Sequence, residues 1–407
     1  MNCRCCNNEL EVEFINLNFA PPSNSYLIKE DLEKVEKYYP LKTMVCRNCW
    51  LVQTIDYAEV DELFSHDYAY FSSTSTGWRL HAKVYCDDII KKLNLNKNSL
   101  VIEVASNDGY LLRNFINHKI PCIGIEPTAS TAAISEQLGI NTVKKFFNEE
   151  LAINFVKQNI LADLIIGNNV YAHVPNINDF TRGLKKILKA GGTINLEFPH
   201  FLQLIMNNQF DTIYHEHFSY LQLSTVCQIF ESAKLKIIDV EELNTHGGSL
   251  RITGCHIEDK RIVNKNVENI INKEILAGLQ NLDIYKSFQH KIESIKYKFI
   301  RFLIEQKLSN KKVVGYGAAA KGNTLLNYLG IKADLVSYIC DASESKQNKY
   351  MPGSHIPIYH PSKIKEDKPN FVVIFPWNLS EEVVKQNIFI RDWDGLFVTV
   401  IPEIKIF

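Results

Sequence analysis

The sequence predicts an α/β protein with three parts: a small N-terminal zinc-binding domain followed by two Rossmann-like α/β domains. Three observations support this prediction. Five of the ten cysteines fall within the first 49 residues. Short apolar runs alternate with helical patterns over residues 100–198, and a second strand leads into a glycine turn at residues 313–317. A chain of 407 residues is long enough for two to four domains, so three parts fit its length.

The N-terminal segment carries two Cys-x-x-Cys pairs, Cys3 with Cys6 and Cys46 with Cys49. Two such pairs can present four thiolates as a tetrahedron, the arrangement that Zn²⁺ favours. Four sulfur ligands leave no open position for chemistry, so we expect a structural zinc site whose loss loosens only the first domain. We expect the other cysteines to be ordinary thiols in a reducing cytoplasm, where clustered cysteines indicate a metal rather than disulfides.

The central part is predicted to alternate between strands and helices, the pattern of a parallel sheet. A helix is expected from about residue 78 to 93. The next predicted elements are a strand at 100–104, a helix at 110–117, a strand at 121–125, a helix at 128–138, a strand at 164–166, a helix that ends at Gly191 and Gly192, and a strand at 193–198. Residues 235–240 and 250–255 are strand-like and bracket a glycine-containing turn, which suits an antiparallel pair at the sheet edge.

The C-terminal part begins with connecting helices. Residues 266–309 are charged, with isoleucine and leucine at helical spacing, and we expect one or two amphipathic helices there. A second α/β unit follows, with strands expected at residues 313–317, 335–340, 371–375 and 396–401. We therefore place the domains at residues 1–75, 76–258 and 259–407.

Charge and hydropathy exclude several classes of protein. The chain has 45 lysines and arginines against 46 aspartates and glutamates, which argues against a partner held by phosphate electrostatics, such as bulk nucleic acid. The N-terminus shows no charged-then-apolar leader, and no run of about 18 apolar residues occurs, so we expect a cytoplasmic protein without a membrane span. The sequence leaves the oligomeric state open and is compatible with a monomer.

A candidate cofactor site follows the first central strand. Its turn contains four candidate residues, Glu103, Ala105, Asn107 and Gly109. Glu126 ends the next strand, where a carboxylate can accept both hydroxyls of a ribose. Two acidic residues without a phosphate-binding lysine fit the cationic sulfur of S-adenosylmethionine better than NAD. Asn168 and Asn169, in the turn after a later strand, complete the predicted cofactor contacts.

The densest polar constellation of the chain lies at residues 211–220, where Tyr214, Glu216 and His217 stand between apolar flanks. It follows the predicted strand at 193–198, and His173 leaves the preceding strand at the same edge. Because ligands bind beyond the carboxyl ends of parallel strands, we expect an active site here. A histidine can take a proton and return it near neutral pH. Metal binding by the His-Glu-His run is the rival chemical interpretation, although adjacent ligands converge poorly, and a satisfied polar turn is the structural one.

These motifs resemble those of the sugar C-methyltransferases of deoxysugar biosynthesis, which methylate C3 of a nucleotide-linked 4-keto-sugar. The resemblance covers nearly the whole chain and rests on the two cysteine pairs and on residues 68–73, 101–112, 168–175, 214–220, 246–251, 315–322 and 341–361. It implies a zinc-binding N-terminal domain, a class I methyltransferase domain that binds S-adenosylmethionine, and a C-terminal α/β domain that contributes to binding a nucleotide-diphosphate sugar. Tyr171 stands where a leucine is common, and we expect it on the pocket wall.

The resemblance also implies roles for individual residues. The general base corresponds to His217, and the same catalytic motif contains Tyr214 and Glu216. The implied or predicted substrate contacts are Tyr68, Ser72, His173, Arg251 and Lys321. Lys321 is a predicted diphosphate contact, because the positive end of a helix and an ammonium both favour an anion.

The implied chemistry suits these residue types. His217 could remove a proton next to a ketone, Tyr214 or a histidine could stabilise the enolate oxygen, and the carbanion would attack the sulfonium methyl group. A sugar O-methyltransferase is the first alternative, since an oxygen acceptor also needs a base. A zinc-containing nucleic-acid methyltransferase or binding protein is disfavoured by the balanced charge. A dehydrogenase would rest on the short turn at residues 315–317 and on Asp341.

Overall fold

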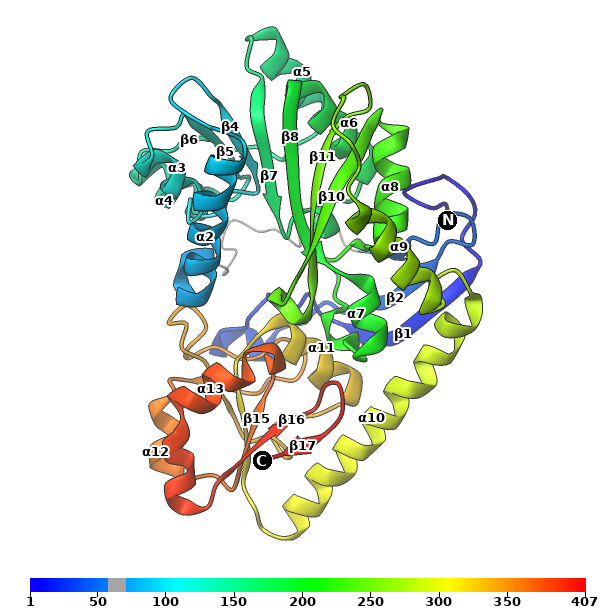
Figure 1. The fold of residues 1–407 in the computed structure, drawn as a ribbon. Helices are drawn as coiled ribbons and strands as arrows, with labels where there is room; N and C mark the ends of the chain where they lie inside the picture. Colours follow the sequence, from blue (N-terminus) through cyan, green and yellow to red (C-terminus); the bar gives the residue numbers. More distant parts are fainter. Residues whose placement is uncertain (58–70) are drawn as a thin grey trace.

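Three sheets form the framework of the protein in a computed structural model that describes residues 1–57 and 71–407 (Figure 1). The N-terminal sheet has the order β1-β2-β3-β9. Its strands are β1 (Val12–Ala20), β2 (Tyr39–Val45), β3 (Val52–Thr54) and β9 (Ser219–Tyr220), with the short helix η1 (Lys29–Glu33) between β1 and β2. Because β9 comes from the middle of the chain, this sheet crosses the first predicted domain boundary.

The central sheet has seven strands in the order β10-β11-β8-β7-β4-β5-β6, all parallel except β11, which runs antiparallel to both neighbours. The strands are β4 (Val101–Val104), β5 (Cys122–Ile125), β6 (Asn141–Val143), β7 (Ala162–Asn168), β8 (Leu188–Pro199), β10 (Leu235–Leu243) and β11 (Ser249–His256). The predicted antiparallel pair at the sheet edge is confirmed by β10 and β11.

Helices cover both faces of the central sheet. One apolar core joins it to α5 (Glu149–Lys157), α6 (Ile177–Ile187) and α8 (Leu223–Ser232), and another joins it to α2 (Thr76–Lys92) and α3 (Leu112–Asn117). The remaining helical segments of this part are η2 (Ser72–Thr74), α4 (Ala129–Gln137), η3 (Tyr171–His173), α7 (Phe201–Met206), η4 (Phe210–Thr212), η5 (Thr245–Gly247) and α9 (Lys265–Leu276).

One predicted helix boundary is wrong. The helix expected to continue to Gly191 ends at Ile187, and residues 188–190 already belong to β8. Leu188 is buried and pairs with Ala162 of β7 ahead of an irregularity in the ladder. The pairing and burial of Leu188 therefore end the helix before the two glycines are reached.

The C-terminal sheet has the order β14-β13-β12-β15-β16-β17, with parallel neighbours except β17. Its strands are β12 (Val313–Tyr316), β13 (Ile339–Cys340), β14 (Ile358–Tyr359), β15 (Phe371–Ile374), β16 (Leu396–Thr399) and β17 (Lys405–Ile406). Its helical segments are α11 (Ala320–Leu329), α12 (Ser362–Asp367), η6 (Trp377–Leu379), α13 (Ser380–Gln386) and η7 (Ile388–Trp393). The strand predicted at 335–340 is shorter, because the N–H groups of Leu335 and Val336 turn back to the Lys332 carbonyl.

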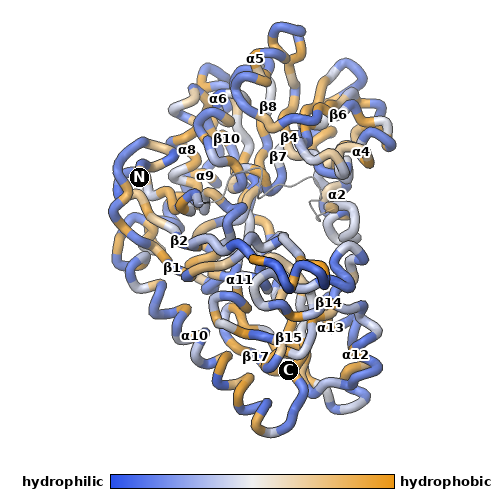
Figure 2. Tube along the Cα trace, turned by 180° about the vertical axis from the view of Figure 1, so that it is seen from behind, coloured by the Kyte–Doolittle hydropathy of each residue, from blue (hydrophilic) through white to orange (hydrophobic). Residues whose placement is uncertain are grey.

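The long helix α10 (Leu282–Leu308) connects the parts. Hydrophobic and hydrophilic segments alternate along it (Figure 2), and its buried residues, such as Phe288 and Phe299, share one core with β1, α7 and the C-terminal sheet. None of the helices in the described ranges has the length and apolar character needed to cross a bilayer.

Candidate active site and metal centre

The four predicted cysteine ligands lie together, with the Sγ atoms of Cys3, Cys6, Cys46 and Cys49 all within 4.8 Å of one another. The Cys3–Cys49 and Cys6–Cys46 sulfur pairs are each 3.5 Å apart. A tetrahedron with Zn–S bonds of about 2.3 Å separates its sulfurs by about 3.8 Å, so the cluster fits this ion. The side-chain amide of Asn8 and the N–H of Asn48 donate to two of these sulfurs, which suits thiolate ligands.

The predicted cofactor residues gather at the carboxyl ends of β4, β5 and β7. The turn after β4 has positive φ at Ala105 (57°), Asn107 (49°) and Gly109 (77°). A Cβ at Gly109 would lie 2.4 Å from the Ile140 side chain, so glycine is required at the start of the helix. Glu126, after β5, accepts a hydrogen bond of 2.9 Å from the N–H of Asn107 and holds the turn.

Several buried polar atoms at this edge have no hydrogen-bond partner within the described ranges: both carboxylate oxygens of Glu103, Nδ2 of Asn168 and Oδ1 of Asn169. Burial raises the pKa of Glu103 well above its usual range, and the charges of Asp108 and Glu126 act in the same direction. Unpaired buried polar groups cost free energy unless a ligand satisfies them. S-adenosylmethionine, with cationic and hydrogen-bonding groups, fits this donor and acceptor set.

Residues just before α2 hold the cofactor turn. The N–H of Ser72 donates to Oδ1 of Asn107 at 2.9 Å, and the N–H of Ser73 donates to Oδ2 of Asp108 at 3.0 Å. Ser72, predicted as a substrate contact, therefore lies beside the cofactor residues. Tyr68 lies outside the described residues.

The predicted catalytic histidine lies at the same edge as the cofactor residues. The ring centroids of His217 and His173 are 4.6 Å apart, and those of Tyr214 and Tyr220 are 4.0 and 6.0 Å from His217. Nδ1 of His217 lies 2.9 Å from the carbonyl oxygen of Thr212. Because a carbonyl only accepts, Nδ1 carries the proton and Nε2 keeps its lone pair.

The surroundings of both imidazoles disfavour their protonated forms. Burial lowers the pKa of His217 well below its usual range, and the neighbouring His173 acts in the same direction. Burial also lowers the pKa of His173 to about 4. His217 is therefore neutral at neutral pH and available as a base. Glu216, beside it in sequence, uses Oε1 to accept a 2.7 Å hydrogen bond from the side-chain amide of Asn24, in the N-terminal part.

Lys321, at the start of α11, brings the C-terminal part to this region. Its ammonium donates to Oδ1 of Asn378 at 2.9 Å and lies 4.4 Å from the centroid of the Trp377 ring. Burial lowers the pKa of Lys321 to about 8, and the Asp211 carboxylate opposes this shift. A buried ammonium beside a helix N-terminus is suited to hold an anion.

The sequence did not single out Asp211 or Trp377 as site residues. The Trp377 indole donates to Oδ2 of Asp211 at 2.8 Å, while Oδ1 of Asp211 is buried without a hydrogen-bond partner in the described chain. Burial raises the pKa of Asp211 to about 6, against the opposing charge of Lys321. The polar character of residues 211–220 was a signal for Asp211, and the position of Trp377 just beyond β15 was a weak one.

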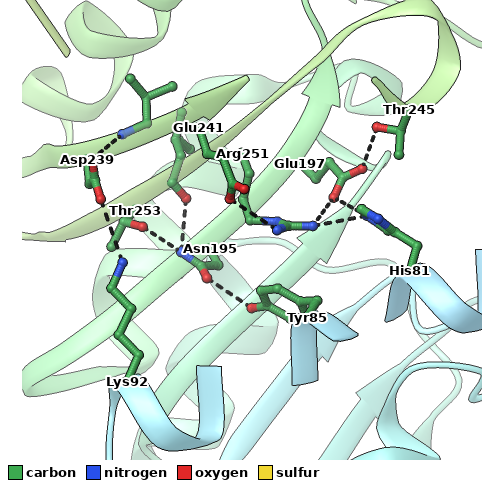
Figure 3. Close-up of polar contacts among 12 residues, drawn as sticks. His81, Tyr85, Lys92, Asn195, Glu197, Asp239, Glu241, Thr245, Arg251 and Thr253 are labelled. Carbon is green, nitrogen blue, oxygen red and sulfur yellow. Dashed lines mark hydrogen bonds and ion pairs between the residues drawn. The ribbon is translucent and has the colours of Figure 1, made fainter. Parts of the chain in front are cut away.

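Arg251, a predicted substrate contact, lies in a network between α2, β8 and β11 (Figure 3). Its guanidinium donates to Oε2 of Glu197 at 2.8 Å and lies 4.6 Å from the centroid of the Tyr85 ring. Glu197 also contacts Nε2 of His81 at 2.9 Å and accepts from the Thr245 hydroxyl at 2.9 Å. Arg251 is thus held by Glu197, and the network fixes the start of η5.

His246, in η5, links the cofactor edge to the C-terminal part. Its Nε2 accepts a 2.9 Å hydrogen bond from Nδ2 of Asn169, and its carbonyl oxygen lies 3.5 Å from the Lys321 ammonium. Its backbone has a positive φ of 54°, which is uncommon for a residue other than glycine. The network around Glu197 therefore supports a residue that touches both predicted binding regions.

Tyr171 does not lie on a pocket wall, so that expectation is wrong. The residue is fully buried, and its hydroxyl is 2.7 Å from the hydroxyl of Thr181. Its ring packs among Phe180, Phe198 and Phe230. It belongs to the apolar core between the sheet and α6, where it fills space beneath the site.

Solved methyltransferase structures resemble part of the chain weakly. A S-adenosylmethionine-dependent methyltransferase from Clostridium acetobutylicum is 11% identical, with 42% of this chain and 89% of that chain covered and a TM-score of 0.33. Magnesium protoporphyrin IX methyltransferase from Synechocystis PCC 6803 is 14% identical, with 44% and 82% covered and a TM-score of 0.35.

Three family models match the chain in the order of its parts. Residues 3–64 match "Putative zinc binding domain", residues 78–240 match "Methyltransferase domain" and residues 244–402 match "C-methyltransferase C-terminal domain". The chain is also 30% identical over 405 residues to the C-methyltransferase NovU of Streptomyces niveus, with 99% of this chain and 96% of NovU covered. The full-length match, with all three models in order, shows that this chain belongs to the S-adenosylmethionine-dependent C-methyltransferases with an N-terminal zinc-binding domain.

Proposed function

We propose that this enzyme methylates C3 of a nucleotide-linked 4-keto-deoxysugar and that His217 is the general base. The observation that carries the proposal is the buried, neutral ring of His217. Its Nδ1–H group donates a hydrogen bond to the Thr212 carbonyl, so Nε2 is unprotonated and its lone pair can accept a proton. The ring lies next to His173, which leaves the sheet at the same edge as Asn168 and Asn169.

In the proposed reaction, Nε2 of His217 takes the proton from C3 of the sugar. The electron pair of the broken C–H bond moves toward C4, and the C4 ketone becomes an enolate oxygen. The Thr212 carbonyl stabilises the imidazolium through the Nδ1–H group. Tyr214, whose ring centroid is 4.0 Å from that of His217, is the proposed donor to the enolate oxygen. When bound, S-adenosylmethionine would supply the methyl group: the methyl carbon would receive the electron pair of C3, while the bond between methyl and sulfur breaks and leaves its electron pair on the sulfur as a neutral thioether.

Charge supports the proposed placement of the two ligands. Glu103 and Glu126 surround the first glycine turn, where a cationic cofactor is favoured. Lys321 is half-buried where η5 meets α11, and we propose that it contacts the diphosphate of the sugar nucleotide. His173 is the proposed contact to the sugar itself. The four-cysteine cluster is proposed to hold one structural zinc ion.

Membership of a C-methyltransferase family favours carbon over oxygen as the acceptor and disfavours a dehydrogenase or a nucleic-acid enzyme. The direct test incubates the enzyme with S-adenosylmethionine and a panel of nucleotide-linked 4-keto-sugars, and identifies the products by mass and NMR. We expect a new carbon-bound methyl group at C3. A methyl group on oxygen, or no reaction with any sugar of the panel, would contradict the proposal.

The base is tested separately by exchange of the C3 proton with deuterated solvent. We expect wild-type enzyme to catalyse exchange and His217→Ala to lose both exchange and turnover by at least about 100-fold while it still binds the cofactor. His215→Gln is the matched control, because His215 lies in the same motif but its ring contacts Tyr39. Turnover that persists in His217→Ala removes His217 from the mechanism.

A further inference from the structure

We propose that Arg4, inside the first cysteine pair, is a positioning residue for the His173–His217 pair. The metal centre would then support the geometry of the active site instead of serving the N-terminal part alone. The catalytic meaning of this inference rests on the proposed role of His217. Its structural content does not, because the placement of the two rings can be measured without turnover.

The Arg4 side chain is only 8% exposed and contacts three separate segments. Its guanidinium donates to the carbonyl oxygen of Pro175 at 3.0 Å and to that of Thr54 at 2.9 Å. It forms a two-point ion pair with Asp56, and its Cζ atom lies 5.2 Å from the centroid of the Phe218 ring. One planar group thus joins the end of β3, the loop after η3 and the segment before β9.

Each of these segments carries or adjoins a histidine of the pair. Pro175 is two residues after His173, and Phe218 directly follows His217. Thr54 donates from its hydroxyl to the His217 carbonyl and from its N–H, at 3.1 Å, to the Phe218 carbonyl. The guanidinium and Thr54 therefore fix the backbone on which both imidazoles stand.

The backbone of Arg4 is itself fixed on both sides. Its N–H donates to Oε1 of Gln53 at 3.0 Å, and its carbonyl accepts from the side-chain amide of Asn178, at the start of α6, at 3.0 Å. Two of the cluster cysteines, Cys3 and Cys6, flank it. Closure of the cysteine cluster around a metal would therefore decide where the guanidinium can reach.

This arrangement argues against the expectation that metal loss loosens only the first domain. Three of the cluster cysteines, Cys3, Cys46 and Cys49, lie in the same apolar core as Tyr171 and Phe180 of the central part. The carbonyl of Cys49 also accepts a 2.7 Å hydrogen bond from the Thr225 hydroxyl, in α8. The cluster is therefore built into the central part.

The test compares Arg4→Gln and Arg4→Lys with Arg47→Gln. Arg47 is a matched control, because it follows the first cysteine of the second pair as Arg4 follows the first cysteine of the first pair. Its side chain, however, is 58% exposed and forms an ion pair of 3.5 Å with Glu11. The assays are zinc content, S-adenosylmethionine affinity, the pH profile of kcat, and the ¹⁵N shifts of the imidazoles by NMR.

We expect Arg4→Gln to keep its zinc and its cofactor affinity but to lose about 10–100-fold in kcat, since small misplacements of reacting groups cost factors of this size. The His173 and His217 resonances should shift. The acid limb of the pH profile should move to higher pH, because looser packing hydrates the rings and raises their lowered pKa values. Arg4→Lys should restore part of kcat, because an ammonium replaces the charge but not the planar set of donors. Arg47→Gln should match wild type.

Unchanged imidazole shifts in a folded, zinc-loaded Arg4→Gln protein would overturn the proposal, as would an equal loss in Arg47→Gln. If Arg4→Gln does not fold, Arg4→Lys decides, since it keeps a positive charge at this position but lacks the planar set of donors to the Pro175 and Thr54 carbonyls. The same shifts are then expected, and their absence overturns the proposal. Shifted resonances with unchanged kcat support the positioning of the rings and count against His217 as the base, so the two proposals fail separately.

Discussion

The buried ammonium of Lys321 predicts a specific pH dependence of substrate binding. Burial lowers its pKa to about 8, far below that of an ordinary lysine, and the Asp211 carboxylate opposes this shift. If the ammonium holds the diphosphate, binding weakens as pH rises through this value, because the neutral amine attracts no anion. The perturbation is therefore pH itself, compared between wild type and Lys321→Arg.

The magnitude follows from the protonated fraction of Lys321. With a pKa of about 8, roughly nine tenths of the side chains are charged at pH 7 and roughly one tenth at pH 9. The kcat/KM for the sugar nucleotide, which reports on the free enzyme, should thus fall about tenfold over this range. A guanidinium stays protonated at every pH tested, so Lys321→Arg should lose this basic limb.

The assay measures kcat/KM at saturating S-adenosylmethionine from pH 6.5 to 9.5 for both proteins with the same substrate, so that ionisation of the substrate cancels in the comparison. Asp211→Asn tests the direction of the shift. Removing the carboxylate while Lys321 is retained should lower the pKa of Lys321 and move the basic limb of the profile to lower pH. A basic limb that persists unchanged in Lys321→Arg, or a flat wild-type profile, would refute the assignment of Lys321 to the diphosphate.

Three further predictions concern the cofactor, the core and the metal. Burial raises the pKa of Glu103, whereas a cationic cofactor favours its ionised form, so cofactor binding should release protons and should tighten with rising pH. Calorimetry in buffers of different ionisation enthalpy measures the proton release, which Glu103→Gln should abolish. Tyr171→Phe removes one buried hydrogen bond and should cost about 1 kcal/mol in the free energy of unfolding with kcat/KM and substrate preference unchanged, measured by denaturant titration and kinetics. Cys49→Ser should lower the zinc content, the melting temperature and turnover, as measured by metal analysis, calorimetry and kinetics. Intact turnover without metal would show that the cluster does not support the active site.

Local patterns predicted most of the fold. The alternation of apolar runs located most of the central strands to within a few residues, because burial on both faces of a parallel sheet requires such runs. The edge strand β6 was not predicted, since none of its three residues is buried. The rule that ligands lie beyond the carboxyl ends of parallel strands predicts that Asn168, His173 and Glu126 share one edge of the sheet. The boundary between α6 and β8 failed because the pairing of Leu188 with Ala162 depends on a strand more than twenty residues away.

Contacts between distant segments could not be predicted from local patterns. Trp377 donates to Asp211, and the charge of Asp211 acts on Lys321, although more than fifty residues separate each of the three from the next in sequence. The residues next to them in sequence do not predict these contacts. Arg4 and Arg47 occupy the same place within their cysteine pairs, yet one is buried behind the histidines and the other is exposed. The tertiary fold, and not the motif, decides which arginine has a role.

The two Rossmann-like sheets suggest why one chain can hold a cation and an anion close together. The order β6-β5-β4-β7-β8 corresponds to β14-β13-β12-β15-β16, and a carboxylate after the second strand of each unit accepts the N–H of the turn, Glu126 from Asn107 and Asp341 from Ala318. The two units differ, however, in the third residue of the first strand of each comparison, β4 and β12. It is Glu103 in β4 but Gly315 in β12, where even a Cβ would lie 2.5 Å from the Phe375 ring.

The first turn therefore has a buried acid on its first strand, whereas the second has a glycine at that position and Lys321 at the start of its helix. Since the same backbone frame surrounds both turns, we propose that this exchange of charge directs a sulfonium to the first turn and a diphosphate to the second. An acid placed near the second turn should weaken the sugar nucleotide and leave the cofactor unaffected. Asn378→Asp, beside the Lys321 ammonium, makes that change without touching the first turn. Equal weakening of both ligands would show that the turns do not discriminate by charge.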